Sequence, residues 1–165
     1  MLITPEYREI QRKLHEIKPN YGICGAEYVK QVLEVSDQMK SRDILDYGCG
    51  KRKLEEALGF PIRNFDPAIP GLDEEPEPAD ILVCTDVLEH IEPECLDEVL
   101  AHLKSLTKRC AILTVCVVPA NKHFPDGRNL HLIIQPMRWW MDKIQEKFRL
   151  LQFNDLDTVG FFVCK

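Results

Sequence analysis

Two glycines in the stretch ILDYGCGKRKLEEAL, residues 44–58, constrain the fold more than any other feature of the chain. Gly48 and Gly50 directly follow a short apolar run and directly precede a charged amphipathic segment. This order predicts a buried strand, a tight turn and a helix, which together form the first half of a parallel β-α-β unit. Ligands of open parallel sheets bind at the carboxyl ends of the strands, where such turns lie. The sequence therefore predicts a parallel sheet with a ligand site beside these glycines.

The rest of the chain continues the alternation of helices and strands. Helical spacing of apolar residues is found at residues 3–17 and 25–40 and in segments beginning at Leu54, Pro93 and Pro136. Apolar runs typical of strands lie at residues 43–47, 61–66, 80–88 and 111–118, followed by runs at 148–153 and 158–165. The last two runs are close enough in sequence to pair as an antiparallel edge. The segment at 67–79 is rich in proline and acidic residues, which predicts a loop.

Length and composition limit the class of protein. A chain of 165 residues predicts a single domain, with residues 1–42 as a helical cap and residues 43–165 as the sheet core. The net charge of −6 makes nucleic acid an unfavourable partner. Seven cysteines without a Cys-x-x-Cys pair predict reduced thiols, and no metal site is predicted. With no apolar stretch long enough for a signal peptide or membrane span, we expect a cytoplasmic protein that does not bind membranes.

The glycine turn is compared with three kinds of cofactor loop. A Walker loop needs Ser or Thr directly after the lysine, but Lys51 is followed by Arg52. A dinucleotide fingerprint needs a third glycine at the position of Lys53, so this loop matches two glycines of three. The third kind, an S-adenosylmethionine loop, agrees with more of the chain.

The stretches ILDYGCG and DILVCTDVLEHI, with an acidic residue at Asp66 between them, resemble the motifs of class I S-adenosylmethionine-dependent methyltransferases. The resemblance covers residues 44–106 in order. It implies an α/β fold of three layers, with a doubly wound, mostly parallel, Rossmann-like sheet and an antiparallel C-terminal edge. Only thirteen residues separate Asp66 from Asp80, so we expect the usual third strand to be missing and Leu72 or Asp73 to replace part of the adenine pocket.

The same resemblance implies a set of cofactor-binding residues. Asp46 would organise the glycine turn, Asp66 would accept hydrogen bonds from the ribose hydroxyls, and Asp86 would lie beside the methyl group. The full expected set for S-adenosylmethionine is Tyr21, Asp46, Gly48, Cys49, Gly50, Asp66, Pro67, Thr85, Asp86 and Val87. The residues after Gly50 depart from the family pattern, so Lys51 is a candidate for binding the cofactor's carboxylate.

The acceptor is the least constrained part of the prediction. His131, His123 and His90 are candidate bases, because histidine exchanges protons near neutral pH. Motifs of enzymes that methylate DNA bases are absent from the sequence, so a small molecule or a sugar-type compound is the expected acceptor. Two alternatives remain open: a non-catalytic methyltransferase-like binding protein and a nicotinamide-dependent oxidoreductase. The sequence makes no prediction of oligomeric state.

Overall fold

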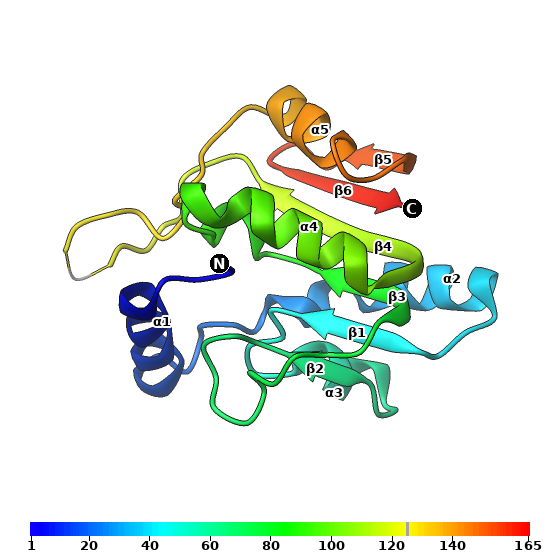
Figure 1. Cartoon of the computed structure of the whole chain (residues 1–165), viewed down its shortest axis with the longest axis horizontal. Helices are drawn as coiled ribbons and strands as arrows, with labels where there is room; N and C mark the ends of the chain where they lie inside the picture. Colours follow the sequence, from blue (N-terminus) through cyan, green and yellow to red (C-terminus); the bar gives the residue numbers. More distant parts are fainter. Residues whose placement is uncertain (125) are drawn as a thin grey trace.

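A single mixed sheet forms the centre of the molecule. The computed structural model describes residues 1–124 and 126–165. Among these residues the six strands have the order β2-β1-β3-β4-β6-β5. They are β1 (Ile44–Tyr47), β2 (Arg63–Phe65), β3 (Ala79–Cys84), β4 (Thr107–Cys116), β5 (Leu150–Asp155) and β6 (Val159–Cys164). Strands β1 to β4 are parallel to one another, and β6 pairs antiparallel with both β4 and β5 (Figure 1). The predicted parallel sheet with an antiparallel edge is confirmed.

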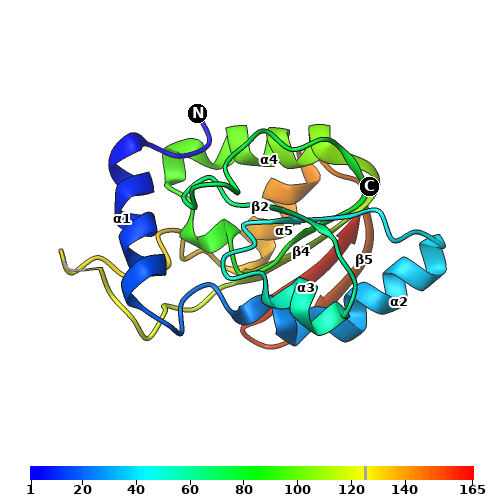
Figure 2. The ribbon, with the colours of Figure 1, turned by 90° about the horizontal axis from the view of Figure 1, so that it is seen from below.

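Helices cover both faces of this sheet. Helices α2 (Val29–Met39) and α3 (Lys53–Leu58) pack on one face, where Val32 and Leu54 contact the side chains of β1 and β3. Helices α4 (Leu96–Leu106) and α5 (Met137–Gln145) pack on the other face, with Leu103 and Trp140 fully buried (Figure 2). Burial on both faces explains why β3 and residues 110–116 of β4 are mostly apolar. The predicted three-layer, doubly wound arrangement is confirmed.

The segment between β2 and β3 contains no strand in the structure. Its turns are closed by backbone hydrogen bonds, including one of 2.8 Å from the Asp66 N–H to the Leu72 carbonyl. Prolines in this segment cannot donate to a strand ladder, which explains the loop. The expected absence of the usual third strand is confirmed. β2 is consequently the edge strand on this side of the sheet.

Helix α1 (Pro5–Ile17) lies across the carboxyl ends of the parallel strands, apart from the two helical layers (Figures 1 and 2). Its apolar stripe packs against the segment after β4, with Tyr7 and Leu14 contacting Phe124 and Leu130. The Tyr7 hydroxyl also donates a 2.7 Å hydrogen bond to the His90 carbonyl. α1 therefore forms one wall above the sheet edge at which the sequence predicts the ligand site.

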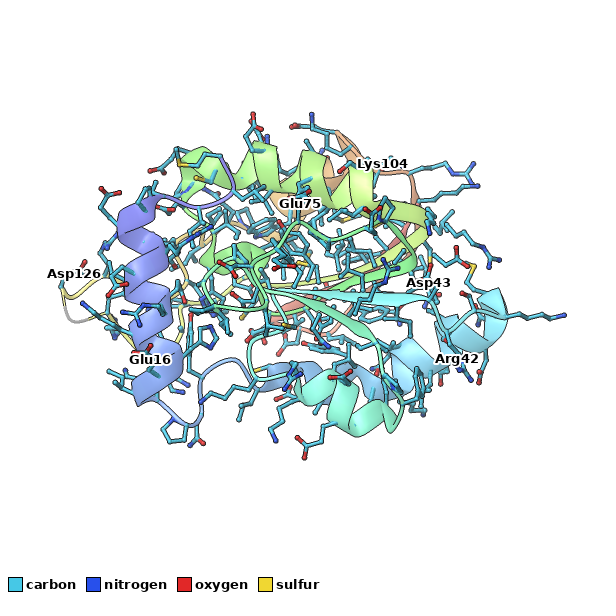
Figure 3. All side chains as sticks on the ribbon, turned by 60° about the horizontal axis from the view of Figure 1, so that its bottom comes forward. Glu16, Arg42, Asp43, Glu75, Lys104 and Asp126 are labelled. Atoms are coloured by element: carbon cyan, nitrogen blue, oxygen red, sulfur yellow. The ribbon has the colours of Figure 1, made fainter. Side chains whose placement is uncertain are left out.

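The remaining elements are short. The helix expected over 25–40 begins as a 3₁₀ turn, η1 (Cys24–Tyr28), and two more such turns, η2 (Leu88–His90) and η3 (Pro93–Cys95), follow β3. Charged side chains such as Glu16, Lys104 and Asp126 point outward from the layers (Figure 3). None of the helices in the described part of the chain has the length and apolar character needed to span a membrane.

Candidate functional site

The glycine turn after β1 is packed against the protein's own atoms. Gly48 and Gly50 have φ angles of 76° and 48°, in the left-handed region that favours glycine. A Cβ atom on Gly48 would lie 2.5 Å from the Val87 side chain, and one on Gly50 would lie 2.7 Å from the Gly22 carbonyl oxygen. We expected a ligand to require these glycines. In the structure, Val87 lies so close to Gly48, and the chain at Gly22 so close to Gly50, that neither position has room for a side chain.

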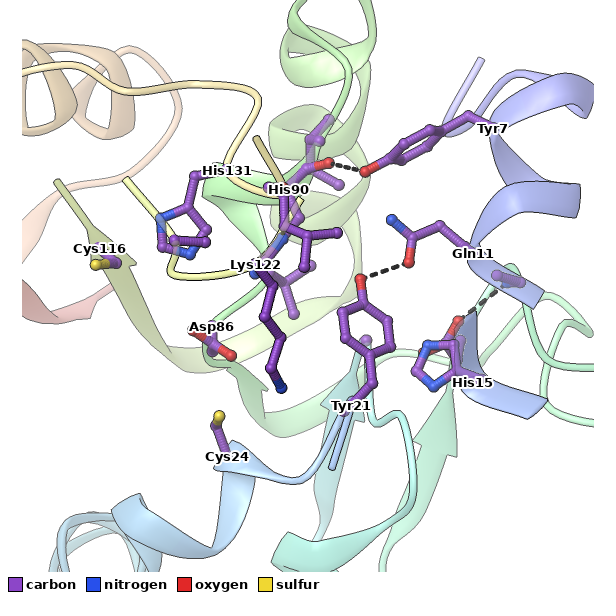
Figure 4. A pocket seen from close by; sticks show the side chains of 18 of the residues that line it. Tyr7, Gln11, His15, Tyr21, Cys24, Asp86, His90, Cys116, Lys122 and His131 are labelled. Carbon is purple, nitrogen blue, oxygen red and sulfur yellow. Dashed lines mark hydrogen bonds and ion pairs between the residues drawn. The ribbon is translucent and has the colours of Figure 1, made fainter. Parts of the chain in front are cut away.

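A cavity of about 410 Å³ opens between the carboxyl edge of the sheet, α1 and the segment after β4 (Figure 4). Residues 47–48 and 66–68 line one side, and Asp86, Val87, His90 and Ile91 line another. Side chains from α1, including Tyr7, Gln11 and His15, complete the wall. This volume lies within the range of small-molecule pockets, roughly 300–1,000 Å³.

Asp66, at the end of β2, is the buried acid of this cavity. Its carboxylate accepts backbone hydrogen bonds of 3.1 Å from Gly50 and 3.0 Å from Ala68. Burial raises the pKa of Asp66, and the two backbone donors and nearby His15 partly offset this effect. Since each carboxylate oxygen can accept two hydrogen bonds, both oxygens keep acceptor capacity for a ligand.

His15 of α1 faces the same carboxylate. Its Nε2 lies 4.0 Å from Asp66 Oδ2, and its Nδ1 is buried without a hydrogen-bond partner. Burial lowers the pKa of His15, so the neutral ring is favoured. A buried ring nitrogen without a partner is costly unless a ligand supplies one. His15 and Asp66 thus form a polar pair in the wall of the cavity.

Asp46 lies behind this wall, outside the cavity. Only 3% of its surface is exposed, and burial, with Asp66 and Glu55 nearby, raises its pKa to about 7. Its neighbours in β1 pair with β2 and β3, so Asp46 occupies the interior of the sheet. The structure thus places Asp46 below the glycine turn, without contact to the cavity.

The opposite end of the cavity holds two histidines. The Nδ1 of His90 is 2.8 Å from the Leu130 carbonyl oxygen, and the Nδ1 of His131 is 2.6 Å from the Val118 carbonyl oxygen. Their rings meet edge to face, with centroids 4.7 Å apart. A carbonyl only accepts hydrogen bonds, so each Nδ1 must carry the proton. In each neutral ring, Nε2 is then the nitrogen with a free lone pair.

Two carboxylates accompany these histidines. Asp86 follows β3 with a φ of 57°, and its N–H donates a 3.0 Å hydrogen bond to Thr114 Oγ1. Glu89 is 1% exposed, and one of its oxygens accepts a 2.7 Å hydrogen bond from the Cys116 N–H. Its other oxygen is buried without a partner. Burial, together with Asp86, raises the pKa of Glu89 to about 8.

Tyr21 lies between the two ends of the cavity. Its hydroxyl donates a 2.6 Å hydrogen bond to Gln11 Oε1, and its ring contacts His15 on one side and His90 on the other (Figure 4). The ring centroids are 4.8 Å and 6.4 Å away, respectively. The predicted role of Tyr21 beside the cofactor is consistent with this position, since the ring divides the acidic end from the histidine end.

The structure brings together part of the predicted site. The predicted residues that line the cavity are Tyr21, Gly48, Asp66, Pro67, Asp86, Val87, His90 and His131. The predicted residues that do not line it are Asp46, Cys49, Gly50, Thr85 and His123. His123 is exposed, since its chain turns away to pair with Asn129. Lys51 does not line this cavity either. Its ammonium group donates hydrogen bonds of 2.7 Å and 2.9 Å to the carbonyls of Lys18 and Pro19.

Sequence reasoning expected the N-terminal helix to cap the site, but it did not identify the α1 side chains or the two thiols that line the cavity. The additional lining residues include Tyr7, Gln11, His15, Cys24 and Cys116. The apolar stripe of α1 predicts that the helix packs, but it does not say against what. Cys116 lies within the apolar run at 111–118, which is typical of a buried strand, yet Cys116 is only half-buried.

A second cavity of about 510 Å³ adjoins the first, and His15 and Ala68 line both. Leu72, one of the two expected substitutes in the adenine pocket, lines this second cavity. Asp73, the other, accepts a 3.0 Å hydrogen bond from the Gly71 N–H and does not line either cavity.

Comparisons with known proteins agree with this architecture. Residues 14–159 match the family described as "Methyltransferase domain". No curated protein matches the sequence. One similar solved structure is 1,6-didemethyltoxoflavin-N1-methyltransferase from Burkholderia thailandensis, with 1,6-didemethyltoxoflavin and S-adenosylhomocysteine bound. The TM-score is 0.69 at 13% identity, over 99% of this chain and 90% of that one.

Two further structures extend the comparison. Magnesium protoporphyrin IX methyltransferase from Synechocystis PCC 6803, with bound S-adenosylhomocysteine, has a TM-score of 0.62 at 17% identity, over 97% of this chain and 94% of that one. An O-methyltransferase family protein from Burkholderia thailandensis has a TM-score of 0.54 at 12% identity. The alignment covers 94% of this chain but only 62% of that protein. At these identities the likeness shows the fold alone.

Proposed function

Because the chain belongs to the methyltransferase-domain family, we propose that it transfers a methyl group from S-adenosylmethionine to a small-molecule or sugar-type acceptor. One observation carries the proposal: Asp66 and Asp86, at the ends of β2 and β3, open onto the same cavity of about 410 Å³. The acid that we propose binds the ribose and the proposed methyl-transfer end would then share one continuous surface, as a single extended ligand requires.

The side chains at the Asp66 end suit the cofactor. Asp66 keeps acceptor capacity for two hydroxyl groups, and the His15 ring beside it lines the same cavity. We propose that the adenine extends toward the second cavity, where Leu72 offers an apolar surface. Gly48 and Tyr21 then border the amino-acid end of the cofactor.

The chemistry requires orientation more than activation. When bound, S-adenosylmethionine supplies a methyl group already activated by its sulfonium. The protein must hold the acceptor in line with that methyl group and exclude water. We propose that the acceptor binds at the histidine end. A proton on the acceptor would leave toward the free Nε2 of His131 or His90 when no other ligand occupies those nitrogens.

Calorimetric titration with S-adenosylmethionine, S-adenosylhomocysteine and NAD tests the cofactor assignment. We expect the first two to bind and NAD to fail. Asp66→Ala should weaken binding at least about tenfold, since a hydrogen bond to a charged group contributes roughly 1.5–3 kcal/mol. Asp142→Ala, which removes an exposed carboxylate of α5 outside both cavities, is the matched control and should bind normally. Failure of the wild-type protein to bind S-adenosylmethionine would contradict the proposal.

A non-catalytic binding protein is the second candidate. Gly22 covers Gly50, and Lys51 is tied to the end of α1, so the glycine turn is covered by the chain itself. This candidate predicts cofactor binding without formation of S-adenosylhomocysteine. Incubation with S-adenosylmethionine and a panel of hydroxylated and amino acceptors distinguishes the two, because catalysis releases S-adenosylhomocysteine with any productive acceptor.

A further inference from the structure

Three metal-ligand groups converge at the histidine end of the cavity. One carboxylate oxygen of Asp86 and one ring nitrogen each of His90 and His131 all lie within 4.8 Å of one another. Asp86 and His90 come from the turn after β3, while His131 comes from the segment that follows β4. Groups far apart in the sequence thus meet at one point, and all three line the cavity (Figure 4).

The histidines are oriented as metal ligands usually are. Each donates its Nδ1 proton to a backbone carbonyl, from Leu130 in one case and Val118 in the other. Such a bond fixes the tautomer and leaves Nε2 as the coordinating nitrogen. Both carbonyls belong to the segment that surrounds the rings, so the lone pairs are fixed before any ligand arrives.

The two carboxyl groups of the cluster, Asp86 and Glu89, also lack an ion-pair partner. No ion pair among residues 1–124 and 126–165 includes Asp86 or Glu89. Glu89 is almost completely buried, and one of its oxygens has no partner. This carboxylate forms a second convergent group with Cys116 and His131, also within 4.8 Å. A buried carboxylate with a partnerless oxygen beside two histidines is the environment that a cation would complete.

We propose that Asp86, His90 and His131 bind a divalent first-row transition-metal ion, with Glu89 as the adjacent buried carboxylate. Two imidazoles and one carboxylate suit Zn²⁺, Fe²⁺, Mn²⁺ or Co²⁺ better than Mg²⁺ or Ca²⁺, which prefer oxygen ligands. The sequence does not reveal this site, because forty-one positions separate His131 from His90 and no short metal motif is present.

The ion would lie in the wall of the cavity and would retain open coordination positions, since only three side chains hold it. An acceptor oxygen or nitrogen could fill such a position. The histidines would then orient the acceptor through the metal instead of taking up its proton. This consequence rests on the proposed function, whereas metal binding itself does not.

Metal binding is measured on the full chain after chelator treatment and without cofactor. Titration with Zn²⁺, Co²⁺ and Mg²⁺ should give one equivalent of Zn²⁺ or Co²⁺, with Mg²⁺ binding much more weakly. Co²⁺ also reports its ligands through its visible absorption. Asp86→Asn and His131→Gln should each weaken Zn²⁺ binding at least about 100-fold, since removal of supporting groups alone costs 10–100-fold. Asparagine tolerates the left-handed φ of residue 86, so Asp86→Asn should fold.

His123→Gln is the matched control, because this exposed histidine lies outside the cavity. It should bind Zn²⁺ like the wild-type protein. Absence of stoichiometric binding, binding that survives both ligand substitutions, or tighter binding of Mg²⁺ would overturn the proposal. Loss of Zn²⁺ binding in Cys116→Ser but not in His90→Gln would also overturn the proposal, because the metal would then be bound by Glu89, Cys116 and His131. Because no cofactor is present, each result is independent of the titration with S-adenosylmethionine.

Discussion

At the scale of single residues, buried carboxyl groups dominate the electrostatics of the sheet's carboxyl edge. Asp46, Asp66 and Glu89 are all at least 90% buried, and burial raises the pKa of each one. Asp66 and Glu89 have backbone hydrogen bonds that partly offset this effect, but backbone donors do not contribute to the pKa of Asp46. Of these three carboxyl groups, Asp46 therefore has the least compensation for the cost of burying its charged form.

Substitution of Asp46 by asparagine should change how stability depends on pH. The folded protein keeps the proton up to a pKa of about 7, while the unfolded chain releases it near 3.8. The contribution of Asp46 to stability is fully present below pH 3.8 and is lost as pH rises to about 7. This loss is at most about 4 kcal/mol, at roughly 1.4 kcal/mol per pH unit. Asp46→Asn should thus lose less stability than the wild-type protein between pH 4 and 7, as measured by denaturant unfolding.

Asp142→Asn, on the exposed surface of α5, is the control for this experiment. It should follow the wild-type pH profile. A profile of Asp46→Asn parallel to that of the wild type would show that Asp46 is already ionised in the folded protein at low pH.

At the same scale, the sequence predicts some residues of the site but not the contacts that they make. The left-handed glycines and the acid at Asp66 could be predicted, because turn geometry and strand ends have local signatures. The partners of these residues could not be predicted. Gly50 is required by Gly22, and Asp66 faces His15, and both contacts depend on how a distant helix docks.

At the scale of elements, α1 and the residues that follow it are held to the sheet by a small number of polar contacts. The N–H and hydroxyl of Thr4 donate to Glu92 at 2.9 Å and 2.7 Å, near the start of the helix. Lys51 binds the carbonyls of Lys18 and Pro19 just beyond its end. The helical stripe predicted the helix itself, but these docking contacts come from residues without a local pattern.

Lys51→Met should loosen the end of α1 while leaving the sheet intact. The substitution keeps most of the aliphatic side chain but removes the donor to two carbonyls. Amide exchange in residues 14–24 should accelerate about fivefold, corresponding to roughly 1 kcal/mol for a partly exposed hydrogen bond. Lys53→Met, which removes an exposed lysine paired with Glu56, is the matched control. Equal exchange in both variants would show that Lys51 does not hold this segment.

At the scale of the whole molecule, the apolar side chains of residues 1–124 and 126–165 form two large clusters and one small cluster. The two large clusters cover the faces of the sheet, and the small one joins α1 to the segment after β4. Alternation of strands and helices predicted the large clusters well, since period and composition report burial on a sheet. It did not predict the small cluster, because loop segments such as residues 120–132 have no periodic pattern.

The separation of the small cluster from the two large ones predicts that α1 opens more easily than the sheet unfolds. Leu113→Ala, in the centre of β4, should lower the free energy of unfolding by about 2–5 kcal/mol and accelerate exchange throughout the sheet. Leu14→Ala, in the small cluster, should mainly accelerate exchange in α1 and in residues 120–132. Denaturant unfolding together with hydrogen exchange separates the two effects. If Leu14→Ala destabilises the sheet as much as Leu113→Ala, then α1 and the sheet unfold as one cooperative unit.

The order of strands at the antiparallel edge has a consequence for biosynthesis. β5 leaves the ribosome before β6, yet β6 lies between β5 and β4 and, in the described part of the chain, provides the only strand pairing of β5. β5 can therefore join the sheet only after the later strand has been made and inserted. During translation, the backbone N–H and C=O groups of β5 have no strand partner until β6 has been synthesised. This edge of the sheet therefore assembles in the reverse of the order of synthesis.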